Sequence, residues 1–516
     1  MTAYKTAQEW KPDYQAFFEA TDQFYSGQIN AGTYKGISGG FGSYAQKGGQ
    51  ANMLRLRMAG GRMTKERLKF IVDAIAEWKI DKVHFTTCQA VQLHNLKADA
   101  VKALSVAALD AGIITRGGGG DFPRNVMVSP LSGVEVGEYF NVTPYAEAAG
   151  DFLLAHIDGP RLPRKLKCCF SNSPANAPHA TYRDLGFVAR EDGRFDVYAA
   201  GGLGNNPRFG VKVTEGVEPS QVLYYIEAMH RTFLTYGNYE SRAKARTRYM
   251  QESLGGPEGF KAAYLEKLAE VRAEGRDLTI PVSAEAPAKQ ADGEAPLSSR
   301  LIAQKQEGLY TVRYHALGGC PRPDWFGEIY RLIADMEQVE LRVAPDETVY
   351  IINLTGKEAA AVLSATEDGA RTVFEESVSC IGAQICQQGI RDSQGLLAEL
   401  VEMERREGFA DGILPQIHIS GCTSSCGTHQ TGVIGFHGCV KMINKVGQPA
   451  FTLHYGGCDR QGEERMGEKL GVILQVDIPT LLCEVGHAVE NSGCGSFAKW
   501  AEAEPEAFRS IAARYL

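Results

Sequence analysis

The sequence lacks the features that would place a protein in a membrane, outside the cell or on a nucleic acid. No stretch reaches the roughly 18 uninterrupted apolar residues that a spanning helix needs, and the start shows no apolar run behind a basic cluster. With 54 basic and 62 acidic residues the formal charge is only −8, and this near balance does not suggest a nucleic-acid role. We therefore expect a cytoplasmic protein with neither a membrane nor a nucleic-acid partner.

Nucleotide-binding signatures are also missing. The glycine-rich segments RGGGGDF (116–122) and GGLGNN (201–206) match neither Walker nor Rossmann spacing. We interpret them as turns in which glycine avoids side-chain collisions. No flavin or nicotinamide domain is evident, so any redox chemistry has to draw its electrons from another protein.

Cysteine, by contrast, is plentiful, with 12 among 516 residues. In a reducing compartment these indicate ligands and buried thiols rather than disulfides. Cys380 and Cys386 flank five residues, and Cys422 and Cys426 flank three. Structural zinc usually takes C-x2-4-C pairs, so the wider gap favours an iron–sulfur cluster held by two separate loops. The alternatives are a structural zinc or redox-sensing site, and buried cysteines with no ligand.

An internal repeat indicates the architecture. Residues 54–96 and 312–354 align without gaps, and Gly60-Gly61 corresponds to Gly318-Gly319. Each unit predicts a strand, a Gly-Gly turn, a helix and two strands, with Thr64 as a helix N-cap in the first. Further along, LPRKLKCCF (162–170) matches LPQIHISGC (414–422). We therefore predict two related α+β halves that face each other across a cofactor cleft.

A segment rich in Ala, Pro and Glu separates these halves and is predicted to be a surface linker. The sequence thus divides into 1–120, an N-terminal segment with the first half-repeat; 121–275, a substrate-facing domain; 276–299, the linker; 300–372, the second half-repeat; and 373–516, the cysteine-bearing domain.

The C-x5-C and C-x3-C pairs, some 35 residues apart in glycine-rich surroundings, resemble those of the sirohaem-containing nitrite and sulfite reductases. The resemblance covers nearly the whole chain. It implies a pseudo-two-fold α+β fold with two ferredoxin-like half-domains and sirohaem- and cluster-binding α/β domains. It also implies that Cys380, Cys386, Cys422 and Cys426 hold a [4Fe–4S] cluster, with Cys426 bridging to the sirohaem iron.

The same resemblance assigns roles to basic residues of the first half. Arg124 in FPRNV, and Lys165 and Lys167 in LPRKLK, are expected to face an anionic substrate, while Arg164 faces the carboxylates of sirohaem. Fixed cations that also donate protons suit a reaction in which oxygen leaves as water. Further cofactor-binding residues implied by the resemblance are Arg55, Arg57, Gln89 and Asn125.

The implied activity is the six-electron reduction of sulfite to sulfide, with nitrite reduction to ammonia as the alternative. Lys167 favours sulfite, because nitrite-reducing members tend to have asparagine at this position, and His94 favours it too. Two departures stand out. Cys88 in TTCQAVQLH replaces a substrate-binding arginine, and CTSSC replaces C-P-N-x-C. These departures predict weaker anion binding and leave room for another small oxidised substrate.

A ferredoxin or flavoprotein is the implied electron donor. Four basic residues in ESRAKARTRYM, Arg242, Lys244, Arg246 and Arg248, fall within two helical turns and form a candidate docking patch for an acidic donor. The alternative is a solvated helix face. Cys168 and Cys169, beside the basic segment, are interpreted as buried small hydrophobic residues rather than ligands.

Overall fold

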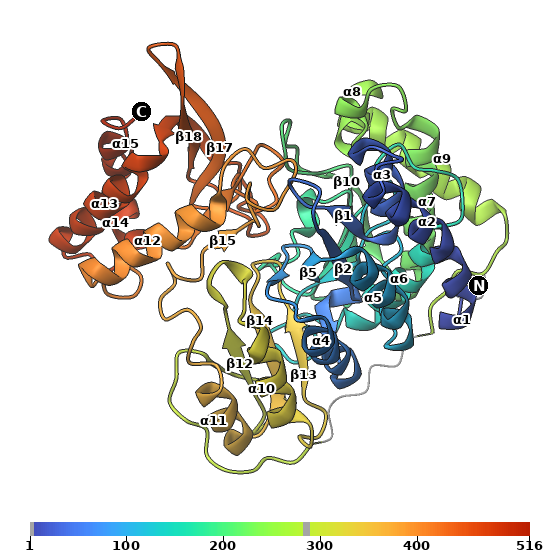
Figure 1. Ribbon diagram of the computed structural model, residues 1–516, viewed down its shortest axis with the longest axis horizontal. Coiled ribbons are helices and arrows are strands. Elements are labelled where there is room, and N and C mark those ends of the chain that lie inside the picture. The colour runs from blue at the N-terminus through green and yellow to red at the C-terminus, as the bar shows by residue number, and fades with distance from the viewer. Residues whose placement is uncertain (1–4, 282–288) are drawn as a thin grey trace.

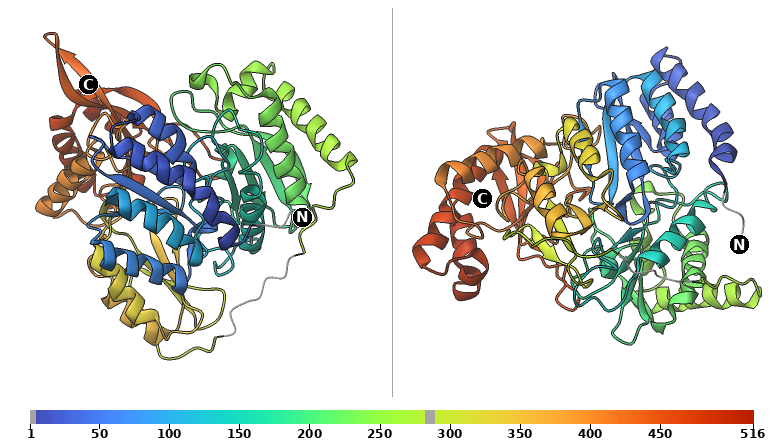
Figure 2. Two further views of the ribbon diagram at one scale, coloured as in Figure 1. Left: turned by 45° about the vertical axis from the view of Figure 1, so that its right-hand side comes forward. Right: turned by 90° about the horizontal axis from the view of Figure 1, so that it is seen from below.

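The protein, a computed structural model that describes residues 5–281 and 289–516, is built from four β-sheets in two related pairs (Figure 1). The first pair comprises the two half-repeats, and the second pair comprises two five-stranded sheets with their helices. Figures 1 and 2 show the blue and yellow half-repeats side by side, with the green unit and the orange-red C-terminal unit on opposite sides of them.

The first half-repeat forms a four-stranded sheet in the order β1-β2-β5-β4. Thr64 begins its long helix as predicted, because the hydroxyl accepts a hydrogen bond from the Arg67 backbone amide. The elements are α1 (Ala7–Trp10), α2 (Gln15–Tyr25), α3 (Ala31–Ser38), β1 (Ser43–Ala45), β2 (Asn52–Arg57), α4 (Lys65–Trp78), β4 (Val83–Phe85), β5 (Ala90–Leu96) and α5 (Ala98–Asp110).

The second half-repeat has the same order of elements at the positions that the gapless alignment predicts. Its sheet runs β11-β12-β14-β13 and is completed by β3 (Arg62–Met63) of the first repeat, which pairs with β13. The elements are β11 (Leu301–Ala303), β12 (Tyr310–Tyr314), α10 (Pro323–Ile333), β13 (Glu340–Val343), β14 (Val349–Leu354) and α11 (Gly356–Ser364).

The two larger sheets share one topology, with three parallel strands followed by two antiparallel ones. The first contains β6 (Met127–Val128), α6 (Thr143–Leu154), β7 (Cys168–Ser171), β8 (Leu185–Ala189), β9 (Phe195–Ala199), β10 (Val211–Val217), α7 (Val222–Tyr236), α8 (Met250–Ser253) and α9 (Pro257–Ala273). The second contains β15 (Val378–Ser379), α12 (Ser393–Glu407), β16 (Ile417–Ser420), β17 (Ile434–Ile443), β18 (Val446–Tyr455), β19 (Glu468–Leu474), α13 (Ile478–Ser492), α14 (Phe497–Ala503) and α15 (Ala507–Ala512).

The structure corrects the match between LPRKLKCCF and LPQIHISGC by three residues. Strands β7 and β16 end at Ser171 and Ser420, and thirteen residues then lead to β8 and to β17. Within these loops, Asn176 and Ser425 both have positive φ, as do His179 and Thr428. The Leu-Pro pairs used for the match lie in irregular segments ahead of the strands, where the two copies differ in length.

Three large hydrophobic cores and one small cluster around Met127 and Cys169 lie within the described residues. One core is shared by both half-repeats and includes Phe85 of β4 packed against Trp325 and Phe326 of α10. The other two lie within the larger sheet units. The described parts of the linker, 276–281 and 289–299, contain neither helix nor strand, whereas 282–288 lies outside the described residues. The five segment boundaries remain a proposal.

No helix among the described residues is long and apolar enough to cross a membrane.

Candidate functional site

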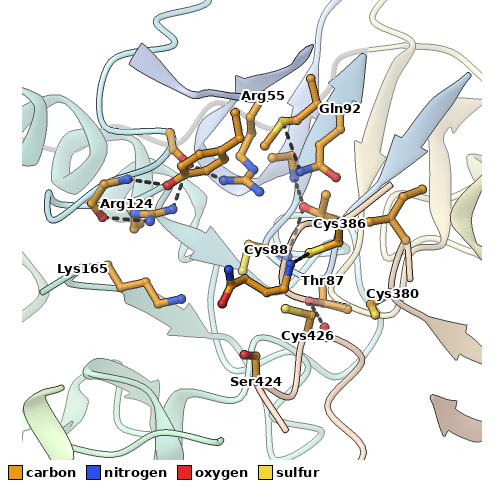
Figure 3. Close-up of a pocket in the computed structure, with 18 of the residues that line it drawn as sticks. Arg55, Thr87, Cys88, Gln92, Arg124, Lys165, Cys380, Cys386, Ser424 and Cys426 are labelled. Carbon is orange, nitrogen blue, oxygen red and sulfur yellow. Dashed lines mark hydrogen bonds between the residues drawn. The ribbon is translucent and has the colours of Figure 1, made fainter. Parts of the chain in front are cut away.

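A cavity of about 970 Å³ lies where the first half meets the cysteine-bearing loops of the second half. Its walls come from β2, β5, the glycine-rich turn at 118–122, the segment before β7, and the loops after β15 and β16. Figure 3 shows Lys165 and Arg124 on one side and Cys380, Cys386 and Cys426 on the other. The cavity therefore places cations of one half opposite thiols of the other.

All four predicted cysteine ligands line the cavity. Backbone amides already donate to two of them: Gly421 N–H to the Cys380 Sγ at 3.1 Å and Gln388 N–H to the Cys386 Sγ at 3.4 Å. In the described part of the chain, no three of the four sulfur atoms lie within 4.8 Å of one another. Ligands of one tetrahedral zinc ion would be roughly 3.8 Å apart, so the thiols as placed do not match a single-ion zinc site.

The cavity is strongly cationic. Among the described residues that line it, eleven are lysine or arginine and three are carboxylates, an excess of eight positive charges. Several N–H groups of these cations are buried without a hydrogen-bond partner, namely Arg124 Nε, Arg183 Nη2 and Arg246 Nε. Because unpaired buried donors are costly, the arrangement suits a ligand that carries many negative groups.

Cys88 and Lys167 form a direct pair in this cavity. The Lys167 ammonium donates to the Cys88 Sγ at 3.0 Å. Burial by itself raises the pKa of Cys88, but the positive charges of Lys167 and Arg183 outweigh it and bring the pKa to about 6. At neutral pH the thiol is therefore largely a thiolate, so the cavity has a fixed negative charge beside Lys167.

Lys165 lies close by with no protein acceptor for its ammonium in the described part of the chain, and it points into the cavity (Figure 3). Burial, together with the positive charges of Arg246 and Lys167, holds the pKa of Lys165 well below its ordinary value. A lysine with a lowered pKa can release a proton near neutral pH, which an ordinary lysine does only slowly.

Arg124 is fixed by backbone carbonyls and faces a tyrosine. It donates to Gly118 O at 2.8 Å and to Gly120 O at 2.9 Å. Tyr44 accepts from the Gly120 N–H at 2.8 Å. Burial opposes ionisation of Tyr44, but Arg124 and Arg55 prevail and lower its pKa. The pair therefore offers a cation and an acidic hydroxyl on one wall.

Asp121 organises the arginines at the cavity edge. It accepts from Arg164 at 2.9 Å, from Arg161 at 3.1 Å and from Arg242 at 2.9 Å. These hydrogen bonds outweigh burial and lower the pKa of Asp121. A carboxylate held among three arginines keeps them fixed while leaving net positive charge at the edge.

Two regions of the chain match family descriptions of known reductases. Residues 44–110 match the nitrite/sulfite reductase ferredoxin-like half domain, and residues 119–271 match the nitrite and sulphite reductase 4Fe-4S domain. The second match falls on the copy of the duplicated unit that lacks the four clustered cysteines.

Similar proteins carry corresponding names. A chloroplastic ferredoxin–nitrite reductase of Arabidopsis thaliana is 26% identical over 404 residues, which cover 75% of this chain and 67% of that protein. A ferredoxin sulfite reductase of Mycolicibacterium paratuberculosis is 24% identical over 432 residues, covering 78% and 73%. The matched domains and these relatives together support the nitrite and sulfite reductase family for this chain. The chain is accordingly an oxidoreductase.

The fold agrees with this family. The structure of the Mycobacterium tuberculosis NirA protein superimposes with a TM-score of 0.76 and covers 93% of both chains at 22% identity. The predicted α+β class and duplicated reductase fold are confirmed.

Nitrite and sulfite reductases use sirohaem and a [4Fe–4S] cluster, and the residues present fit both groups. Sirohaem carries eight carboxylates, which suit a cavity lined by eleven lysines and arginines and only three carboxylates. The four thiols, spaced too widely for one ion, and the N–H···S bonds to Cys380 and Cys386 suit a cluster, whose sulfurs are commonly held this way.

The cavity brings together every site residue predicted from the sequence except Gln89. Gln89 is fully buried with positive φ, and its amide donates to Val128 O and Val343 O while it accepts from Val128 N–H. It joins neighbouring sheets of this reductase, so we leave it out of the proposed binding set. Two residues that do line the cavity also donate side-chain hydrogen bonds to backbone carbonyls. Arg57 donates to the carbonyls of Arg116, Pro123 and Arg124. Asn125 donates to those of Met58, Cys88 and Gln89.

The four residues of the predicted donor patch do not form one helix face. Arg242 and Lys244 lie in one short 3-10 helix and are exposed, whereas Arg246 and Arg248 are turned inward: Arg246 pairs with buried Asp184 at 3.1 Å, and Arg248 donates to Asn206 O. Arg242 pairs with Asp121 at the cavity edge. The alternative of a solvated helix face is wrong for the same reason. These arginines line or support the reductase site instead of presenting one exposed face.

Sequence reasoning missed Tyr44, Thr87 and Arg183, which also line the cavity. Thr87 donates its hydroxyl to the Cys426 carbonyl at 2.7 Å and so ties the two halves at the cluster loop. Thr87 stands directly before Cys88, a position that the TTCQ motif could have indicated. No local pattern marks Tyr44 or Arg183. Both predicted buried cysteines, Cys168 and Cys169, are buried in β7.

Proposed function

We propose that this protein reduces sulfite to sulfide in a six-electron reaction at sirohaem coupled to a [4Fe–4S] cluster. The observation that supports it most is the opposition of four thiols and two half-buried lysines, Lys165 and Lys167, across one cavity. Cys380, Cys386, Cys422 and Cys426 would hold the cluster, and Cys426 would also reach the sirohaem iron. When bound, these groups supply an iron site for the substrate and single electrons.

The chain's own residues would bind the anion and move protons. The guanidinium of Arg124 supplies a positive charge, and two backbone carbonyls fix its orientation. Lys165, whose pKa burial lowers, would give protons to departing oxygen, and Lys167 would hold the anion beside it. Arg164, held by Asp121, would face the carboxylates of sirohaem together with Arg55.

Nitrite is the second candidate substrate, and Cys88 is the observation that favours it. The Cys88 thiolate offsets the charge of Lys167, so the pocket has less positive charge than one with arginine at this position. A singly charged anion depends less on that charge than sulfite does. Lys167 itself supports sulfite, by its resemblance to sulfite-reducing members.

A ferredoxin is the proposed electron donor, because similar proteins are named as ferredoxin-dependent reductases. A flavoprotein is the alternative donor. A cytoplasmic location remains a prediction. All twelve cysteines are free thiols in the structure.

Spectroscopy of matched cysteine variants tests the cofactor assignment. We expect the wild-type protein to be coloured by haem and to contain iron and acid-labile sulfide. Cys426→Ser should lose the cluster and lose or uncouple the haem, whereas Cys168→Ser, buried away from the cavity, should keep both. A Cys426→Ser protein with an intact cluster and full activity would overturn the bridging role.

Steady-state kinetics with Lys167→Asn test the substrate. If Lys167 holds sulfite, kcat/KM should fall far more for sulfite than for nitrite, because the smaller anion needs fewer cationic contacts. Equal losses for both anions would show that Lys167 acts on the cofactor or the fold. Wild-type turnover of nitrite alone would replace sulfite by nitrite as the substrate.

A further inference from the structure

Three histidines that do not line the cavity gather at the loop that carries Cys422 and Cys426. His437 lies on β17, His454 on β18, and His429 in the loop that carries Cys422 and Cys426. The β17–β18 register pairs Gly435 with His454 and His437 with Thr452, so the two strand histidines are diagonal neighbours on one face. The opposite face packs Phe436 and Leu453 into the hydrophobic core.

The rings are arranged as metal ligands. Each histidine offers one ring nitrogen, and these three atoms all lie within 4.8 Å of one another. The His437 Nδ1 and His454 Nε2 are 3.0 Å apart. The His429 Nδ1 lies 3.0 Å from the Ser420 Oγ, which leaves its Nε2 available. Such a hydrogen bond on the second nitrogen is what orients a metal-bound imidazole.

The protonation state of the three rings also suits a cation. His429 and His454 are buried and His437 is half-buried. Burial lowers the pKa of each ring, and neighbouring rings lower the pKa of His429 and of His437 further, so all three are neutral near pH 7. No proton then has to be displaced when a metal binds.

Hydrogen bonds account for one nitrogen of each ring, between His437 and His454 and between His429 and Ser420, but not for the remaining nitrogen of His454. In addition, the His454 Nδ1 is buried without a partner. Lys469 faces the site from β19, paired with His454 in the ladder, and its charge acts on both strand histidines. A cation this close disfavours a bare dication but stabilises a negatively charged fourth ligand.

We propose that His429, His437 and His454 form a mononuclear site for Zn²⁺ or a similar first-row divalent ion, separate from the four-cysteine centre. Three imidazoles with an open fourth position are a donor set that zinc, copper, nickel and iron accept. Hydroxide or a small anion beside Lys469 completes the coordination. Bound there, the metal joins the cluster loop to the β17–β18 hairpin and stabilises that loop.

Metal binding to the intact holoenzyme tests the site. The protein is dialysed against a chelator, then equilibrated with Zn²⁺ and passed through a desalting column before zinc, iron and sulfide are measured. We expect one retained zinc per chain with unchanged iron and sulfide. His437→Gln and His454→Gln should each weaken zinc binding by on the order of 100-fold while keeping iron, sulfide and colour.

Two control variants distinguish this site from zinc bound elsewhere on the chain. Glu407, Cys483 and His487 form another candidate metal group among the described residues. His487→Gln removes the exposed histidine of that group and should leave zinc retention unchanged. Lys469→Gln leaves all three histidines in place and removes both the repulsion of the dication and the support of its anionic fourth ligand, so zinc should still be retained. X-ray absorption at the zinc edge should show nitrogen neighbours at about 2.0 Å rather than sulfur at about 2.3 Å.

Several results would overturn the proposal. These are the absence of retained zinc in the wild-type protein, loss of zinc in His487→Gln but not in His437→Gln, and sulfur neighbours in the absorption spectrum. Zinc-dependent melting temperature gives a second readout: zinc should raise it for the wild-type protein and not for either strand variant. Equal zinc-induced rises in all of them would also contradict the site.

Discussion

At the scale of single residues, Cys88 sets the charge of the substrate side of the cavity. Its Sγ accepts from Lys167, and Arg183 and Lys165 also act on it. An arginine at this position would add a positive charge, whereas the thiolate adds a negative one. Substitution at this one position therefore changes the local charge by two units.

Cys88→Arg should tighten binding of sulfite or of an anion that competes with cyanide. The expected gain is roughly 1–3 kcal/mol, the scale of a charge-assisted hydrogen bond. Titration of the anion against the haem absorption of both proteins measures it. Unchanged or weaker affinity in a folded variant would mean that this branch has rebuilt its pocket for another substrate, or that position 88 does not contact the anion.

The pKa of Cys88 predicts a pH dependence. Its folded pKa of about 6 lies below that of an ordinary thiol, so the thiolate persists above pH 6 and becomes a neutral thiol below it. Nitrite keeps one charge over this range, so its affinity should rise as the pH falls through about 6. Cys88→Ser should bind nitrite more tightly at pH 7 and lose this dependence, which haem titrations at several pH values would reveal.

How far sequence predicts the site depends on where each residue lies in the chain. Arg124, Lys165, Lys167 and the four cysteines stand in short motifs, so their types and spacing indicated their chemistry. Tyr44 and Arg183 reach the cavity only because separate segments fold together, and Gln89 lay in a motif yet turned away to hold backbone groups. Motifs predict neighbourhood, whereas side-chain direction depends on the tertiary contacts.

At the scale of elements, the Gly-Gly turns join each half-repeat to its surroundings. Gly60 and Gly61 have φ of 62° and 65°, and Gly318 and Gly319 have 59° and 67°. A Cβ on Gly61 would lie 2.3 Å from the Val343 carbonyl oxygen of the other repeat. The turn therefore needs glycine both for its backbone conformation and for close approach between the two sheets.

Gly61→Ala should destabilise the protein far more than a matched glycine substitution. We expect a cost of about 3–5 kcal/mol from left-handed strain plus displacement of Val343. Gly112→Ala, also at positive φ but with open space around its Cβ, should cost about 1–2 kcal/mol. Melting temperatures of both variants provide the comparison, and equal losses would show that the close approach contributes little.

Element prediction succeeded where both copies kept the same length. Residues 54–96 and 312–354 align without gaps, and their strands, turns and helices occur at matching positions. The strands β7 and β16 were misaligned by three residues because the irregular segments before them differ in length. Hydrophobic alternation cannot reveal such a slip when both strands are buried on two faces, as these are.

At the scale of the whole molecule, the two halves are interlocked by more than the linker. Strand β3 of the first half-repeat completes the sheet of the second, and Arg62 pairs with Glu340 across the junction at 2.7 Å. Both repeats share one hydrophobic core. The linker is itself anchored, since the buried Lys289 ammonium donates to Glu337 O and Asn353 O.

Cutting the chain after fully exposed Leu297 should therefore leave the enzyme assembled. With a protease site inserted there, the two fragments should elute together, with the haem colour and activity retained, because the shared core and the β3–β13 pairing persist. Size-exclusion chromatography after cleavage measures this. Separation of the fragments in native buffer would show that the covalent connection is needed to hold the halves together.

The loop after β7 has the same length and the same positive-φ positions as the loop after β16, which carries Cys422 and Cys426. Ser129 stands at the position of Cys380, and its hydroxyl accepts from Asn172 N–H as the Cys380 sulfur does from Gly421 N–H, both at 3.1 Å. Ser173 and Ala177 stand where the other copy has Cys422 and Cys426.

This correspondence fits the duplication of one unit. One copy of the loop carries the thiols, and the other keeps the loop's conformation without them. Asn176 in that loop now donates to the Asp459 carbonyl of the opposite half. The loop after β7 has no ligand cysteine, yet it still contributes a contact that holds the two halves together.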